Sequence, residues 1–97
     1  MIVVFSDPAH ADLLDILTYI AQDNPPAALD VVDEIERFCA QTLSDNPMIG
    51  TVFETAVPNI RMFPKQSYNI FYRIASDQIE IVRVLHHSRL AENILNM

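Results

Sequence analysis

The side chains that could carry out chemistry in this 97-residue chain lie in its second half. His86 can accept or donate a proton near neutral pH, while Arg61 and Arg83 can stabilise negative charge that develops on a phosphate. These three residues form the only set suited to acid–base catalysis on a phosphodiester. The set requires a fold that brings the three side chains together.

The same region could instead serve as a protein-binding surface. Arginine and aromatic side chains are the usual anchors of protein–protein interfaces. The candidate binding residues are Arg61, Met62, Tyr68, Arg83, His86 and Arg89. Arg61 and Arg83 are the strongest candidates, because a charged side chain on an otherwise apolar strand needs a partner or a solvent-facing role.

Charge is distributed unevenly along the chain, whose net charge is −7 at pH 7. Residues 1–45 carry nine acids and one base, whereas residues 46–97 carry four acids and five bases. Because nucleic-acid-binding surfaces are normally basic, direct sequence-specific binding of nucleic acid is not expected. We interpret the acids of the first half as solvated helix faces rather than a metal site, and we expect no cofactor.

The first half predicts a strand followed by two helices. Residues 2–5 are β-branched and aromatic, and the pairs Asp7-Pro8 and Asn24-Pro25 are typical of helix starts. Apolar residues then recur with a helical period. The expected buried residues are Leu13, Ile16, Leu17 and Ile20 in the first helix and Ala28, Val31, Val32, Ile35, Phe38, Cys39 and Thr42 in the second. The short connection between them predicts an antiparallel helical hairpin.

Two features bear on cellular location. Cys39 is the only cysteine and lies in the apolar pattern, so we expect a buried, inert thiol and no intrachain disulfide. The chain begins with no recognisable signal peptide, and its apolar runs are too short to span a membrane. A cytoplasmic protein is expected.

The second half changes to a period of two, which indicates strands. We expect a short or irregular strand at 51–55, one at 59–63 between Pro58 and Pro64, and two more at 68–74 and 79–86 joined by a four-residue loop. The hairpin register pairs Ile74 with Ile79, Arg73 with Glu80, Tyr72 with Ile81 and Phe71 with Val82. This register places Arg83 on the face of Tyr72 and His86 on the opposite face, unless a β-bulge intervenes.

These elements predict a single α+β domain over residues 1–97, in the order β-α-α-β-β-β. The helical hairpin should cover one face of a mainly antiparallel sheet, with an optional short helix within residues 88–97. The other face, or one edge of the sheet, would remain for function. An exposed edge, either the first strand or the 51–63 region, could accept a strand or helix from a partner.

Two stretches of the second half resemble a known family. They are Tyr68-Asn69-Ile70-Phe71-Tyr72-Arg73 and the ending Ile79-Glu80-Ile81-Val82-Arg83-Val84-Leu85-His86-His87-Ser88-Arg89. With Ile60-Arg61 and the helical half, they resemble the RelE/ParE superfamily of toxins from type II toxin–antitoxin systems, and the ParE branch more than the RelE branch.

The resemblance implies a bacterial toxin that a cognate antitoxin neutralises. ParE-like members inhibit DNA gyrase by protein binding, and the Arg61 position and the His86–Arg89 ending match residues that they often keep. RelE-like members are ribosome-dependent mRNA endonucleases that use the substrate 2′-hydroxyl as nucleophile; Arg61, Arg83 and His86 would be the catalytic set. The third alternative is an inactive toxin fold that only binds partners. The acidic chain and its single lysine, Lys65, favour the gyrase inhibitor over the nuclease.

Overall fold

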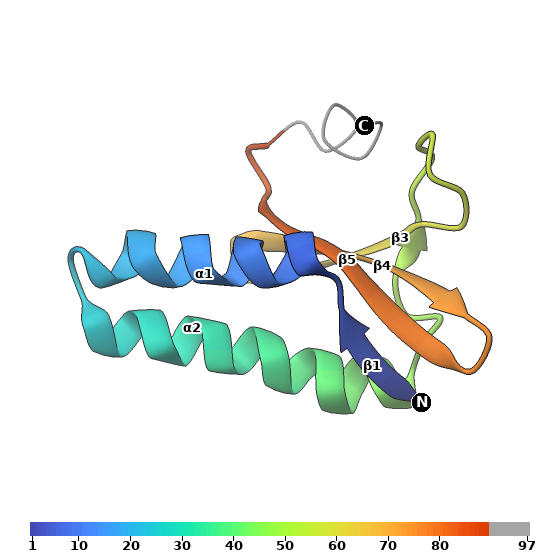
Figure 1. Ribbon diagram of the computed structural model, residues 1–97, viewed down its shortest axis with the longest axis horizontal. Helices are drawn as coiled ribbons and strands as arrows, with labels where there is room; N and C mark the ends of the chain where they lie inside the picture. Colours follow the sequence, from blue (N-terminus) through green and yellow to red (C-terminus); the bar gives the residue numbers. More distant parts are fainter. Residues whose placement is uncertain (90–97) are drawn as a thin grey trace.

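The computed structural model describes residues 1–89 and has the predicted α+β architecture (Figure 1). The expected helix near the C-terminus falls, from residue 90 onward, outside the described residues. The elements in chain order are β1 (Ile2–Phe5), α1 (Asp7–Ala21), α2 (Pro25–Arg37), the π-helical turn η1 (Phe38–Leu43), β2 (Thr51–Val52), β3 (Arg61–Lys65), β4 (Tyr68–Ala75) and β5 (Gln78–His86). No helix among the described residues is long and apolar enough to cross a membrane.

Both helices begin where the sequence predicted. The Ser6 hydroxyl accepts a hydrogen bond from the Ala9 N–H at 3.1 Å, and the Asn24 side chain accepts one from the Ala27 N–H at 3.1 Å. A proline lies in the first turn of each helix, where its missing N–H costs no hydrogen bond. Figure 1 shows the two helices side by side, as a helical hairpin.

The predicted buried side of the second helix was wrong at Thr42. Ile35, Cys39 and Leu43 are fully buried, whereas Thr42 is exposed. The wider turn η1 departs from the α-helical period, so Leu43 rather than Thr42 points into the core. Cys39 is buried as expected, and burial, together with the charge of Glu36, raises the pKa of its thiol to about 12. The thiol is therefore inert near neutral pH.

The sheet has the order β1-β5-β4-β3-β2 and is antiparallel except where β1 runs parallel to β5. The helices cover one face and bury Ile70, Tyr72 and Ile81 beneath Ile16 and Ile35.

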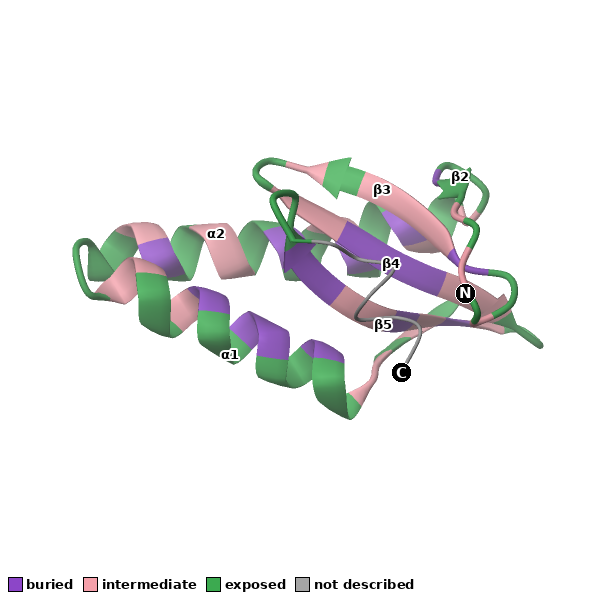
Figure 2. Ribbon diagram, turned by 90° about the horizontal axis from the view of Figure 1, so that it is seen from above, coloured by how far each residue is buried: buried purple, intermediate pink, exposed green. Residues whose placement is uncertain are grey.

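The opposite face of the sheet is less exposed than expected. A second cluster buries Ile60, Phe71 and Leu85 there, with Phe53 and Val57 packed against it from the segment before β3. Figure 2 shows the buried centre of β4.

The strands at the β2 side differ from the prediction in their bounds. β3 runs from Arg61 to Lys65 rather than over 59–63, so Pro64 lies within it. A proline is tolerated here because β2 pairs only with Arg61 and Met62, which leaves the outer side of β3 unpaired at Pro64. The β4–β5 loop has two residues rather than four, since Ala75 pairs with Gln78.

The predicted hairpin register is correct near the loop and wrong beyond it. Ile74 pairs with Ile79, Tyr72 with Ile81, and Arg73 with Glu80, and the last two side chains form an ion pair at 2.6 Å. Phe71, however, pairs with Arg83 rather than with Val82. A β-bulge between these pairs adds one residue to β5 and changes the direction of every side chain after it.

Gly50 is confined by a buried tyrosine. Its N–H donates to the Tyr72 hydroxyl at 2.8 Å, and that hydroxyl donates to the Pro47 carbonyl at 2.8 Å. A Cβ atom on Gly50 would lie 2.6 Å from the hydroxyl oxygen of Tyr72 and 3.0 Å from the carbonyl oxygen of Met62. The backbone therefore passes too close for any larger residue.

We expect the Gly50→Ala substitution to lower the free energy of unfolding by about 1–3 kcal/mol, because the added methyl group must displace Tyr72 from its two hydrogen bonds. Urea denaturation measures the loss. Met48→Ala, at an exposed position of the same segment, is the control and should change stability by less than about 0.5 kcal/mol. An equal, small loss in both variants would contradict the close approach.

Candidate functional site

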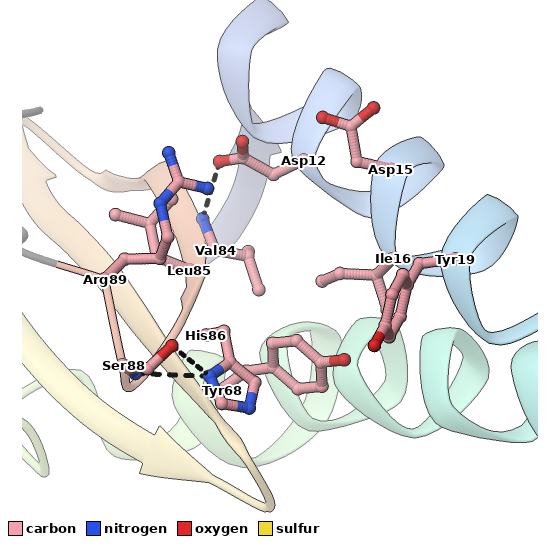
Figure 3. A pocket seen from close by; sticks show the side chains of 10 residues that line it. All are labelled: Asp12, Asp15, Ile16, Tyr19, Tyr68, Val84, Leu85, His86, Ser88 and Arg89. Carbon is pink, nitrogen blue, oxygen red and sulfur yellow. Dashed lines mark hydrogen bonds between the residues drawn. The ribbon is translucent and has the colours of Figure 1, made fainter.

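A groove of about 350 Å³ runs between α1 and the C-terminal end of β5 (Figure 3). We call it the α1–β5 groove. Helix α1 forms one wall, β5 and the turn after it form the other, and Tyr68 enters from the start of β4. The lining residues are Asp12, Asp15, Ile16, Tyr19, Tyr68, Val84, Leu85, His86, Ser88 and Arg89.

The groove begins where β1 stops. At Ser6 the chain turns into α1; the Ser6 N–H donates to the Ile81 carbonyl at 3.0 Å and its hydroxyl donates to the Val82 carbonyl at 2.8 Å. Beyond this point no strand of the described sheet neighbours β5 on this side. Instead, the Asp12 carboxylate accepts the Val84 N–H at 2.9 Å. The start of α1 thus replaces the missing strand at the edge of β5.

Asp12 also forms a bidentate ion pair with Arg83. The Arg83 Nε atom donates to Asp12 Oδ2 at 2.7 Å, and Nη2 donates to Oδ1 at 2.8 Å. The side chains are 8% and 19% exposed for Asp12 and Arg83, so the pair is largely withdrawn from water. Hydrogen bonding to Asp12 raises the pKa of Arg83, against the opposing effect of burial. Arg83 therefore links β5 to α1 through its two hydrogen bonds to Asp12.

Two aromatic rings, those of Tyr68 and His86, contribute to the strand wall of the groove. The His86 ring packs edge-on against Tyr68, with centroids 5.5 Å apart, and stacks on His87 at 4.6 Å. His86 Nδ1 accepts the Ser88 N–H at 3.2 Å and lies 2.8 Å from the Ser88 hydroxyl. Burial, with a contribution from Tyr19, raises the pKa of Tyr68. Tyr68 thus remains a neutral phenol, with an apolar ring and a polar tip suited to a protein interface.

The six predicted site residues do not form one site. Tyr68, His86 and Arg89 line the groove. Arg83 lies beside it, bound to Asp12. Arg61 and Met62 belong to the other end of the sheet, where Arg61 Nη1 donates to the Gly50 carbonyl at 2.7 Å and Met62 packs against the second cluster.

The proposed catalytic set is also divided. Arg61 pairs with Tyr72 and His86 pairs with Tyr68, so their partners on β4 are four residues apart. That separation corresponds to roughly 13 Å of strand. Arg83 is joined to Asp12 rather than to either of them. In addition, no group of three potential metal ligands occurs within residues 1–89.

Sequence reasoning missed the helical wall of the groove. Asp12, Asp15, Ile16 and Tyr19 recur at intervals of three, four and seven residues, a spacing that places them on one side of α1. Asp12 was interpreted as a solvated acid, yet it is only 7% exposed. Tyr19, at 74% exposure, leaves most of its ring available for contact. The helical spacing of these four residues was the signal that could have revealed this wall.

In a comparison with family models, residues 3–91 match the family described as the ParE toxin of the type II toxin–antitoxin system parDE. No curated protein sequence matches this chain significantly.

Solved structures with the same fold come from toxin–antitoxin complexes. The chromosomal ParDE system of P. aeruginosa matches with a TM-score of 0.73 and 24% identity, covering 89% of this chain and 95% of that one. The RelBE2 complex of Mycobacterium tuberculosis gives 0.69 and 22%, with coverages of 89% and 96%. The YoeB–YefM complex of Staphylococcus aureus gives 0.59 and 15%, with coverages of 88% and 94%. At these identities the similarity shows the fold.

Proposed function

Because this chain belongs to the ParE toxin family of type II toxin–antitoxin systems, we propose that it inhibits DNA gyrase by binding to it and that a cognate antitoxin neutralises it. This mode of action follows the ParE-like toxins that the sequence resembles. We propose the bacterial cytoplasm as its location, because its proposed target, DNA gyrase, acts there.

The proposal rests on the observation that Arg83 and Arg61 are both bound to other groups of the protein. Cleavage of a phosphodiester needs cationic side chains that are free to approach the phosphate. Here the Arg83 guanidinium is paired with Asp12, and Arg61 donates to Gly50 at the other end of the sheet. Inhibition by binding needs no catalytic constellation. It needs exposed anchors such as Tyr19 and Arg89, both of which line the groove.

An antitoxin partner has separate support. The similar structures of the ParDE, RelBE2 and YoeB–YefM systems are all of toxin–antitoxin systems. In this chain the α1–β5 groove combines apolar, aromatic and charged side chains, as partner-binding surfaces do. We assign the antitoxin to this groove.

A gyrase supercoiling assay, run beside mapping of message cleavage, tests the proposal. Purified toxin at micromolar excess should reduce supercoiling, and addition of the antitoxin should restore it. Brief expression should leave translated messages intact. Codon-linked cuts that disappear in the His86→Ala variant would support the nuclease instead. Absence of both effects would identify a partner-binding protein without toxic activity.

A further inference from the structure

A second cleft, of about 270 Å³, lies between the C-terminal part of α2, the turn η1 and the end of β3. We call it the α2–β3 cleft. Two basic side chains, Arg37 and Lys65, reach it from different elements. The residues that line it are Glu34, Arg37, Phe38, Gln41, Thr42 and Lys65, and none of them lines the α1–β5 groove. The cleft is therefore a separate feature of the surface.

Neither Arg37 nor Lys65 forms an ion pair or a side-chain hydrogen bond within residues 1–89. The other basic residues lie elsewhere: Arg73 binds Glu80, Arg83 binds Asp12, Arg61 binds the Gly50 carbonyl, and Arg89 lines the α1–β5 groove. Two unpaired cations thus share one cleft in a chain whose net charge is −7. Because like charges repel, an anion bound between them would lower the energy of the site.

An aromatic ring gives the cleft an apolar surface beneath its cations. Phe38, the first residue of η1, stacks on Phe63 of β3 with ring centroids 4.8 Å apart, which joins the turn to the strand. The Lys65 ammonium lies 5.5 Å from the centroid of the Phe38 ring, where a cation–π interaction holds it. Since β2 pairs with β3 only at Arg61 and Met62, no strand of the described sheet covers the outer edge of β3 at Lys65. The cleft thus combines an apolar surface with a cationic rim.

The acid of the cleft neutralises neither cation. Glu34 accepts a hydrogen bond from Nε2 of Gln66 and forms no ion pair in the part of the chain that the structure describes. Two bases and one acid give the lining a net charge of +1. A site with this charge suits one anionic group, whereas the charge of the whole chain would repel the many phosphates of a nucleic acid.

We propose that the α2–β3 cleft binds one carboxylate of gyrase, from an aspartate or glutamate side chain; this inference rests on the proposed inhibition of gyrase. An arginine binds a carboxylate through two parallel N–H···O bonds, and the Lys65 ammonium adds another charge-assisted bond. The apolar stem of the same side chain would lie against Phe38. The exposed side chains of Gln41 and Thr42 offer further donors. Because the antitoxin is assigned to the α1–β5 groove, the cleft extends the gyrase-binding surface beyond the groove.

The affinity for purified gyrase, measured by calorimetric titration of the full chain, tests the inference. Arg37→Gln and Lys65→Gln should each weaken binding by about tenfold, because each removes one of the cations that hold the carboxylate. Wild-type affinity in both variants would overturn the carboxylate contact and leave gyrase inhibition standing. A wild-type chain that does not bind gyrase would overturn the inhibition and the contact together. Weakened antitoxin binding with unchanged gyrase binding would overturn the assignment of the cleft to gyrase.

Removal of an acid separates a local contact from the overall charge. Glu34→Gln removes the carboxylate of the cleft and keeps a group that can bond to Gln66, so gyrase binding should strengthen by about threefold or more. Asp33→Asn makes the same charge change at a neighbouring exposed residue outside the cleft and should bind as the wild type does. Equal strengthening in both variants would overturn the site. All the substituted side chains are exposed or half-buried, so the variants should keep the fold.

Butyrate, a carboxylate on a short apolar stem, tests the chemistry of the cleft without a partner protein. In an NMR titration of the full chain, butyrate should shift the amide signals of Gln41 and Thr42 more than its neutral analogue butyramide does. The Lys65→Gln substitution should abolish this difference. Equal shifts with butyramide in the wild type would overturn the role of the cations. Shifts as large with inorganic phosphate at the same ionic strength would overturn the preference for a carboxylate with an apolar stem.

Discussion

The Asp12→Ala substitution is expected to lower the free energy of unfolding by about 3–5 kcal/mol, the usual cost of removing one partner from a buried ion pair. Without the carboxylate, the Arg83 guanidinium loses two hydrogen bonds while remaining mostly shielded from water. The Val84 N–H, in a buried part of β5, loses its acceptor as well. Since a domain of this size has a total stability of about 5–15 kcal/mol, the loss is a large fraction of it.

Urea denaturation measures the effect, and two further variants define its cause. Asp15→Ala, one turn further along α1, removes an exposed carboxylate and should change stability by less than about 0.5 kcal/mol. Asp12→Asn keeps an oxygen that can accept the Val84 N–H but loses the charge, so its stability should fall between those of the wild type and Asp12→Ala. If the Asp12→Ala variant does not fold, Asp12→Asn still reports the ion pair. Indistinguishable losses at positions 12 and 15 would contradict a structural role for the pair.

Local sequence signals predicted the elements of the fold. The pairs Asp7-Pro8 and Asn24-Pro25 predicted where the helices begin, and such signals need no knowledge of tertiary structure. In the structure Ser6 caps the first helix and Asn24 caps the second. The pairing of Arg73 with Glu80 fixed the hairpin register near its loop for the same reason, since the two residues are only seven apart. The α+β architecture then follows from the need of both helices to bury their apolar sides.

The β-bulge could not be predicted from the same signals. Val82, Val84 and Leu85 are all apolar, so the sequence around the bulge fits either alternation of faces equally well. The structure resolves the ambiguity by a contact with α1, because Arg83 and Val84 bind Asp12, which is more than 70 residues away in the chain. A long-range contact of this kind determines the register, and no local pattern records it.

Only the strand wall of the candidate site could be predicted from the sequence, and the reason is again that local patterns do not record long-range contacts. Its strand wall, with Tyr68, His86 and Arg89, stood out because polar and aromatic residues are conspicuous at the end of an apolar strand. Its helical wall did not stand out, because acids and a tyrosine are ordinary on an exposed helix face. Arg83 was selected for its charge, and the buried partner that explains this charge lies on the helix whose acids were taken to be solvated.

Tyr19 should be the energetic centre of antitoxin binding. Tyrosine is among the residues that most often dominate interfaces, and Tyr19 is 74% exposed on the α1 wall, facing Tyr68. We expect Tyr19→Ala to weaken antitoxin binding by about 30-fold or more, which corresponds to roughly 2 kcal/mol. The free energy of unfolding should stay within about 0.5 kcal/mol of the wild-type value, because little of the ring is buried.

Calorimetric titration with purified antitoxin measures the affinity. Leu29→Ala is the matched control, since Leu29 is an apolar residue of α2 with 59% exposure that does not line the groove. A loss of affinity in the Leu29 variant but not in the Tyr19 variant would move the antitoxin from the α1–β5 groove to the outer surface of α2.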